Sequence, residues 1–369
     1  MSFTLGKELK ITVSGASHSE KIEVKIEGLP AGESIDIGKV NAFLKRRQGG
    51  NAVYTTARKE KDEPVITSGI KEQDGNAVLT GETLTAHFVN ENARSGDYKK
   101  MRTVPRPSHA DYVAYVKYGG ELNMAGGGFF SGRMTLPMCF AGAVCMQILK
   151  KRGILIRAHI LSVGDVDDEK FDPVSDEMED YAAHTLPVLS AKAGDQMTAL
   201  MESVSRDGDS VGGKIECKVT GIPAGLGDPI YDSVESALSY GMFGIPAIKG
   251  IEFGEGFGVC RNRGSVSNDG FCIKDGKVSC ITNNSGGIQG GITNGMPLIF
   301  SVAVKPTPSI YKKQRSVDLE TMQECELQIE GRHDSCIVPR VVPCVEAMTA
   351  LVLADMIFDP AKNGTQDYK

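Results

Sequence analysis

The sequence contains no tryptophan, and aromatic residues make up only 6% of its 369 positions. It also lacks an excess of positive charge, because 41 basic residues face 47 acidic ones, which gives a net charge of −6. General nucleic-acid binding needs a basic face, so this balance excludes it while leaving room for a local pocket for a small anion. With 41% hydrophobic and 24% charged residues, the composition is typical of a folded globular protein.

Long hydrophobic runs are also missing. Residues 1–13 hold no apolar signal core, and the near-apolar stretch 134–149 is interrupted by Gln147 and bounded by Arg133 and Lys150. That stretch is too short for a membrane span and predicts a buried helix. The nine cysteines are scattered and form no CxxC pair, so we expect no disulfide framework and no metal site. Reduced thiols fit a cytoplasmic protein.

An internal repeat organises the chain. Residues 21–32 (KIEVKIEGLPAG) and 214–225 (KIECKVTGIPAG) are identical at eight of twelve positions. Each copy predicts a strand, a turn built on Pro-Ala-Gly, and a following helix. We therefore expect a single domain spanning 1–369, built of two related halves (about 1–200 and 201–369) around a pseudo-two-fold axis, with a frayed tail after residue 360.

Two stretches predict helices that are apolar nearly all round, residues 135–151 and 342–358, so both should be buried between layers. Glycine is abundant, at 43 residues against a usual share of roughly 7%, and it clusters at 126–128, 286–287 and 290–291. No cluster forms a GxGxxG or GxxxxGK[ST] motif, so dinucleotide and P-loop folds gain no support. The glycine clusters are turns, or backbone that closely approaches a flat or phosphorylated ligand.

Histidines in loops are the main candidates for proton transfer. Only six histidines exist, and three of them (His18, His109 and His333) lie in small-residue or arginine-flanked segments. A lone loop histidine is more often structural, but three beside clustered cations favour acid–base chemistry on an anion. The residues alone therefore predict an α+β protein with duplicated halves and a loop-built anion site containing histidine.

A series of motifs resembles the chorismate synthase family, in the family's order and over nearly the whole chain. The motifs are RRQGG and TTARKEKDEPVITSG within 46–69, RSGDY (94–98), RPSHADY (106–112), GDSVGGKIE (208–216), GIPAGLGDP (221–229), IPAIKGIEFGEGF (245–257), NNSGGIQGGI (283–292), KPTPSI (305–310) and GRHDSCIVPRVVPCVEAM (331–348). The resemblance implies a β-α-β sandwich with buried helices between antiparallel sheets, assembled as a homotetramer. It implies a shikimate-pathway phosphate lyase that converts 5-enolpyruvylshikimate 3-phosphate into chorismate by anti-1,4-elimination with reduced FMN.

The resemblance also assigns roles to individual residues. His18 matches the histidine that protonates the departing phosphate, with Ser17 beside it, and His109 matches the one that acts on the reduced flavin. Asp334 matches the carboxylate that assists removal of the C6 hydrogen. The flavin-binding positions are Ser131, Ala247, Gly290, Lys305, Pro306, Thr307, Pro308, Ser309 and Arg332, and the substrate-binding arginines are Arg46, Arg47, Arg133 and Arg340.

Two departures from the family pattern keep a second interpretation open. Ala52 and Phe129 stand where the pattern has arginine. Losing a charge-assisted contact should weaken binding, so an active enzyme with a raised KM is expected. The alternative is a catalytically impaired paralogue that binds flavin or anions on the same scaffold. A purely structural oligomer would leave the histidine–arginine loops unexplained, and no nicotinamide fingerprint indicates how the flavin is reduced.

Overall fold

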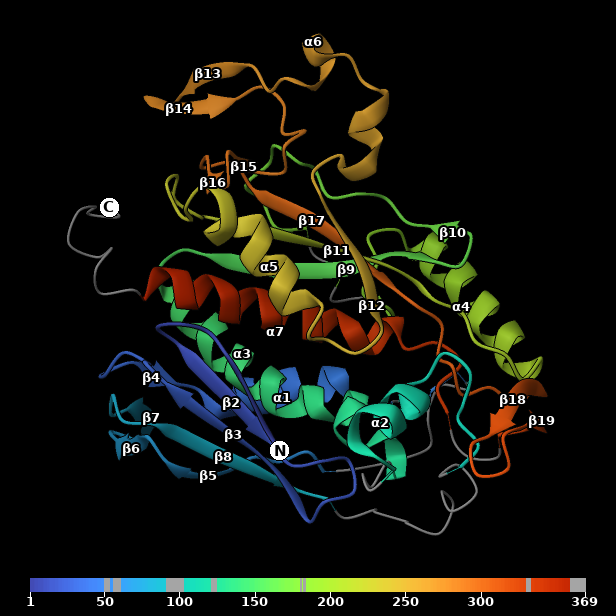
Figure 1. Ribbon diagram of the computed structural model, residues 1–369. Coiled ribbons are helices and arrows are strands. Elements are labelled where there is room, and N and C mark those ends of the chain that lie inside the picture. Colours follow the sequence, from blue (N-terminus) through green and yellow to red (C-terminus); the bar gives the residue numbers. More distant parts are fainter. Residues whose placement is uncertain are drawn as a thin grey trace.

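Two five-stranded antiparallel sheets enclose a layer of helices in this computed structural model, which describes residues 1–49, 54–55, 61–90, 103–120, 125–179, 181, 184–329 and 333–358 (Figure 1). Period-two patterning explains the sheets. In β3 (Lys21–Glu27), for example, Ile22, Val24 and Ile26 face the core while the lysines and glutamates between them face outward. The predicted α+β sandwich is thereby confirmed.

The first sheet has the strand order β1-β2-β3-β8-β5, and the second has the order β10-β9-β11-β17-β12. The bounds of the other strands in the first sheet are β1 (Ser2–Leu5), β2 (Lys10–Ser14), β8 (Leu84–Val89) and β5 (Val65–Ser68). Those of the second are β10 (Val166–Asp167), β9 (Leu155–Val163), β11 (Gly213–Thr220), β17 (Leu298–Val304) and β12 (Ile248–Phe253).

The two copies of the sequence repeat occupy equivalent places. β3 is the middle strand of the first sheet and β11 the middle strand of the second, and in each sheet the edge strand, β5 or β12, precedes its inner neighbour in the chain. Helices α1 (Ile37–Arg47) and α5 (Val234–Met242) follow the two repeats. Two related halves would produce this shared order, and the division of the chain at about residue 200 remains a prediction.

The helical layer contains α3 (Thr135–Lys151) and α7 (Val338–Ile357), which pack against each other and against both α1 and the sheets. α3 has the bounds that the sequence predicts, and α7 begins four residues earlier, because Pro339 is tolerated in a first helical turn. The segment Gly132–Lys151 is apolar and long enough to cross a membrane, but 78% of it is buried inside the fold. It is a core helix, as predicted.

Smaller elements surround the sandwich. The remaining helices are α2 (Asp111–Tyr118), α4 (Ala191–Arg206) and α6 (Gly264–Ser267), with short 3-10 segments η3 (Ala125–Phe130), η4 (Gly132–Met134), η5 (Ile230–Asp232) and η6 (Gly256–Arg261). A three-stranded sheet has β4 (Ser34–Ile35), β7 (Asn76–Leu79) and β6 (Ile70–Gln73). Three hairpins pair β13 (Phe271–Lys274) with β14 (Lys277–Cys280), β15 (Ile288–Gln289) with β16 (Ile292–Thr293), and β18 (Gln314–Asp318) with β19 (Gln323–Leu327). The predicted frayed tail lies outside the described residues.

Candidate active site

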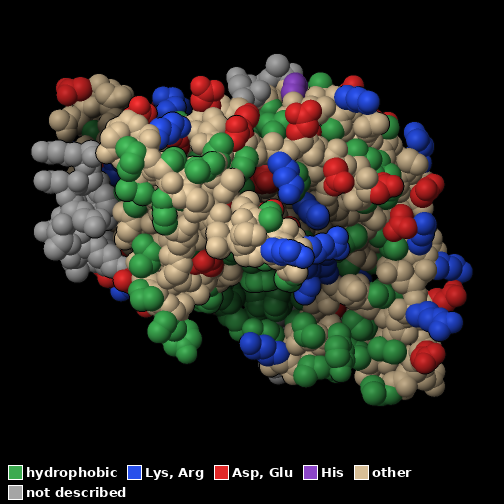
Figure 2. All heavy atoms as spheres, turned by 90° about the horizontal axis from the view of Figure 1, so that it is seen from above, with side chains coloured by type: hydrophobic (Ala, Val, Ile, Leu, Met, Phe, Trp, Pro, Cys, Tyr) green, Lys and Arg blue, Asp and Glu red, His purple; other side chains and the backbone are tan. Residues whose placement is uncertain are grey.

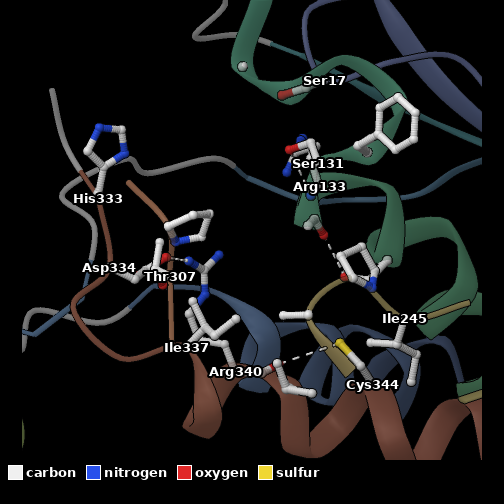
Figure 3. A pocket seen from close by; sticks show the side chains of 18 of the residues that line it. Ser17, Ser131, Arg133, Ile245, Thr307, His333, Asp334, Ile337, Arg340 and Cys344 are labelled. Atoms are coloured by element: carbon white, nitrogen blue, oxygen red, sulfur yellow. Dashed lines mark hydrogen bonds and ion pairs between the residues drawn. The ribbon is translucent and has the colours of Figure 1, made fainter. Parts of the chain in front are cut away.

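A cavity of about 800 Å³ lies at the N-terminal ends of α3 and α7. Thr135 lines it from the start of α3 and Arg133 from η4, which directly precedes that helix. Ile337, the N-cap of α7, and Arg340 and Cys344 in the first turns of α7 line it from another side (Figure 3). Because the N-terminus of a helix carries unpaired N–H groups and partial positive charge, two such ends favour anionic ligands.

Most residues that the sequence assigned to the site come together here, although they span positions 17 to 340. Ser17 and Arg133 lie on one wall in Figure 3, and Asp334 and Arg340 lie on another. The assigned residues that line the cavity are Ser17, Arg47, His109, Ser131, Arg133, Ala247, Lys305, Thr307, Pro308, Asp334 and Arg340.

Four other assigned residues that the structure describes are not part of the cavity lining, and Arg46 is treated below. His18 lies behind Gly126, and Ser309 lies behind Arg106, which donates a hydrogen bond of 3.2 Å to the Ser309 hydroxyl. Pro306 stands between two lining residues, and Gly290 lies in the β15–β16 turn. Arg332 and Ala52 lie outside the described residues.

The position of Arg46 does not fit its predicted role as a substrate ligand. Its guanidinium makes two hydrogen bonds, of 2.5 and 3.0 Å, to the carboxylate of Glu346 on α7. Glu346 also accepts a hydrogen bond from the backbone N–H of Ala158 on β9. Successive helical residues point in different directions, so only Arg47 of this pair reaches the cavity. Arg46 instead ties α1 to the helical layer.

The buried carboxylate of Asp62 holds two of the cavity's arginines. It accepts a hydrogen bond of 2.9 Å from Arg47, and it pairs through its other oxygen with Arg133. Sequence reasoning missed Asp62, although it lies inside the motif TTARKEKDEPVITSG. On the opposite wall, Arg340 donates to Asp334 at 2.6 Å and to the backbone carbonyl of Arg47 at 3.0 Å. The arginines are thus fixed before a ligand arrives.

His109 is held by a carboxylate that the sequence analysis also missed. Its Nδ1 lies 2.7 Å from Asp111 Oδ1 and 3.0 Å from Arg106 Nη2, so the Arg106–Asp111 ion pair engages this ring nitrogen. Burial opposes ionisation of Asp111, but hydrogen bonds from Arg106 and His109 outweigh burial and lower its pKa below the usual value. This arrangement leaves Nε2 of His109 as the ring nitrogen that exchanges protons.

The triple glycine lies beside both candidate histidines. Gly126, Gly127 and Gly128 all have positive φ, between 54° and 86°, which favours glycine. A Cβ at Gly126 would come within 2.1 Å of the His18 ring, and one at Gly127 would lie 3.7 Å from the His109 ring. The loop therefore passes beside both imidazoles, with Gly126 against the His18 ring and Gly127 near the His109 ring.

Four buried polar atoms of the lining residues have no hydrogen-bond partner among the described residues: Ser17 Oγ, Arg47 Nε, Thr307 Oγ1 and His333 Nε2. Burial, together with the positive charge of Arg106, lowers the pKa of His333. Burial and the nearby Lys249 lower the pKa of Lys305, whose Nζ donates to the carbonyl of Ser108 at 2.5 Å. Unpaired buried polar groups are costly, so these atoms favour a polar ligand.

Phe129 does not occupy a ligand-facing position. Its ring packs against Phe130 at 4.8 Å, Phe3 at 5.5 Å and Tyr118 at 5.7 Å, and Phe130 is the residue that lines the cavity. The missing arginine therefore leaves no hole in the lining, because an aromatic cluster fills that place.

Comparisons with known proteins agree with this geometry. The family model described as chorismate synthase matches residues 9–358. The chain belongs to the chorismate synthase family. It is 41% identical to a chorismate synthase of Lancefieldella parvula, with 97% of each chain covered, and 45% identical to one of Thermococcus gammatolerans, with 95% of this chain and 96% of the relative covered.

A solved structure, described as a crystal structure of chorismate synthase, shares the fold. Its TM-score is 0.75 at 26% sequence identity, with 98% of this chain and 94% of that chain covered. The predicted membership of the chorismate synthase family is confirmed, and the protein is an enzyme of that family. No finding favours the impaired paralogue.

Proposed function

We propose that the protein converts 5-enolpyruvylshikimate 3-phosphate into chorismate and inorganic phosphate, in an anti-1,4-elimination that requires reduced FMN. The observation that carries the proposal is the cavity of about 800 Å³ in which Arg47, Arg133, Lys305 and Arg340 converge. Guanidinium groups bind carboxylate and phosphate through paired hydrogen bonds, which suits a substrate carrying both.

The cavity fits a flavin phosphate beside this substrate. Its volume is near the upper end of the range of about 300–1,000 Å³ for small-molecule sites, as two ligands require. The unpartnered Thr307 Oγ1 and His333 Nε2 would hydrogen-bond the flavin, and Lys305 would neutralise its charge. When bound, reduced FMN supplies electron density that eases the loss of phosphate, with no net redox change.

The chain's own residues then orient the substrate and move protons. Arg47 and Arg133, fixed by Asp62, hold the anionic groups and stabilise the charge that develops on the departing phosphate. His109 holds or releases a proton at Nε2 while Asp111 fixes its Nδ1. The carboxylate of Asp334, held by Arg340, is the base for the C6 hydrogen.

His18 is proposed to protonate the departing phosphate. It acts past Gly126, a residue of the cavity lining that lies directly against its ring. Ser17, directly before it, presents a buried hydroxyl to the cavity. The absence of a Cβ at position 126 is what leaves this short path open.

We also propose a cytoplasmic homotetramer. All nine cysteines are free, which fits a reducing compartment. Large apolar side chains are exposed around the β13–β14 hairpin and η5, including Ile273 (73%) and Tyr231 (88%). Figure 2, which views the molecule from the side of this hairpin, shows hydrophobic side chains gathered around a hollow. Exposed apolar surface of this kind is typical of subunit interfaces.

Phosphate release under anaerobic conditions with dithionite-reduced FMN tests the proposed reaction. Phosphate and chorismate should form in equal amounts with reduced FMN, and neither should form with oxidised FMN. Arg47→Met should raise KM at least about 10-fold, because it removes one charge-assisted contact to the substrate. Arg206→Met, at the exposed end of α4, is the control and should leave KM unchanged. Flavin binding without turnover at any substrate concentration would contradict the proposal.

A further inference from the structure

Two cysteine thiols meet where the two core helices cross. Cys139 on α3 and Cys344 on α7 place their sulfur atoms 3.7 Å apart. The helix backbones are close beside them, since a Cβ at Gly142 would lie within 2.5 Å of Ala347. A disulfide has an S–S length of about 2.0 Å, so a movement of under about 2 Å would join the pair.

The pair also has access to the cavity, because Cys344 lines it (Figure 3), while its partner Cys139 is fully buried. The hydrogen bond from the Cys139 thiol outweighs burial and, with the charge of Arg47, lowers the pKa of Cys344 to about 7. Burial raises the pKa of Cys139 well above its ordinary value. The reactive thiolate therefore forms on the side that small solutes reach.

We propose that Cys344 and Cys139 form a reversible dithiol–disulfide site that is oxidised by a hydroperoxide entering the active-site cavity. In the first step the Cys344 thiolate attacks hydrogen peroxide, which forms a sulfenic acid on Cys344 and releases hydroxide. In the second step the Cys139 sulfur attacks that sulfenic acid, which forms the disulfide and releases water. Two thiols are oxidised, and one peroxide is reduced to two waters. A cytosolic thiol pool reverses the reaction.

The disulfide would disturb the site without unfolding the core. Cys344 lies one helical turn after Arg340, and its thiol donates to the carbonyl of Arg340 at 3.5 Å. Drawing the Cys344 sulfur toward Cys139 removes this contact and shifts the turn that carries Arg340. Oxidation should therefore lower activity reversibly.

Peroxide treatment followed by thiol counting and peptide mapping tests this inference independently of the enzyme's reaction. The wild-type protein should lose two of its nine thiols per chain, and a linked Cys139–Cys344 peptide should appear and disappear with dithiothreitol. Cys145→Ser is the matched control, because Cys145 is also buried on α3 and has no sulfur partner among the described residues. It should behave as the wild type does.

The variant Cys139→Ser provides a second test, which can be read even if another variant folds poorly. Without its partner, Cys344 should stop at the sulfenic acid and be labelled by dimedone, whereas Cys344→Ser should give neither label nor link at this site. A disulfide mapped elsewhere, or oxidation of only the exposed Cys260, would overturn the proposal.

Discussion

At the scale of single residues, carboxylates decide which charged groups face the ligand. Asp62 fixes Arg47 and Arg133, Asp111 fixes His109, and Glu346 removes Arg46 from the site. Buried ion pairs contribute little to stability because of desolvation, so their value here is in positioning. An arginine in this region can therefore face the ligand or instead hold two helices together, depending on the carboxylate with which it pairs.

Replacement of either candidate histidine should remove most of the activity. His18→Ala and His109→Ala should each lower kcat by at least about two orders of magnitude, the usual contribution of a positioned acid or base. His87→Ala, on β8, is the control and should keep normal turnover, because His87 is half-buried and remote from the cavity lining. Steady-state phosphate release measures all three. Equal losses at all three positions would show that the assignment is wrong.

The motifs located the cavity but could not assign every side chain in it. Arg46 and Arg47 are adjacent and chemically identical, and only the direction of each side chain on α1 separates them. The family pattern suggested that Phe129 replaces a ligand-binding arginine, yet its ring packs in an aromatic cluster with Phe3 and Tyr118. Both outcomes depend on distant partners, which no local pattern in a single sequence reveals.

At the scale of elements, the site depends most on the backbone conformation of the triple-glycine segment. Its positive φ angles and its lack of side chains leave room for the rings of His18 and His109 beside it. Periodicity predicted helices, strands and the repeat because these follow from local burial. It left this segment as either a turn or a ligand-facing loop, because glycine carries no side chain whose pattern could decide.

Gly126→Ala should therefore damage catalysis beyond its effect on stability. The new Cβ would lie 2.1 Å from the His18 ring at a φ of 61°, so the ring must move. Gly119→Ala is the matched control, because its φ is 66° and nothing lies within 4 Å. Both should lose about 1–2 kcal/mol of stability, but only Gly126→Ala should lose at least about 10-fold in kcat. Comparing kcat with thermal denaturation separates the two effects, and equal kcat losses would rule out the proposed contact.

A buried network ties β9, β11 and the acidic segment 165–180 together. His159 on β9 contacts Glu216 at 3.0 Å and Asp168 at 3.2 Å. Much of the described part of this segment is exposed, but the carboxylate of Asp168 is fully buried. Burial opposes the charge on His159, while its hydrogen bonds to the two carboxylates outweigh burial and raise its pKa above 6.5.

This network should make stability depend on pH. The pKa of His159 is higher in the folded protein than its unfolded value, near 6.5. Its interactions therefore stabilise the fold fully below pH 6.5, and this stabilisation is lost as the pH rises through the folded-state pKa. His159→Gln should therefore lower the free energy of unfolding more at pH 6 than at pH 9, by about 3–5 kcal/mol at pH 6. Urea unfolding at both pH values measures it, with His87→Gln as the control. A pH-independent difference would contradict a charged His159.

At the scale of the whole molecule, the cavity is built by segments from both ends of the chain, whereas the β13–β14 hairpin carries several exposed apolar side chains, among them Phe271, Ile273 and Val278. Ile273→Glu on that hairpin should weaken assembly, because burying an unpaired carboxylate in an interface costs several kcal/mol. Met322→Glu, at the equally exposed tip of the β18–β19 hairpin, should not. Sedimentation velocity compares them, and an unchanged tetramer for Ile273→Glu would exclude this surface from the interface.

The position of α7 at the centre of the sandwich has a consequence for how the protein is made. About 190 residues separate the end of α3 from the start of α7, the helix that α1, α3, α5 and the second sheet all contact. At about 5–20 residues per second, a ribosome needs roughly 10 to 40 s to synthesise that interval. During this time the apolar faces of the earlier elements lack their central partner. The nascent chain should therefore be a good client for chaperones that hold exposed hydrophobic segments until the last helix emerges.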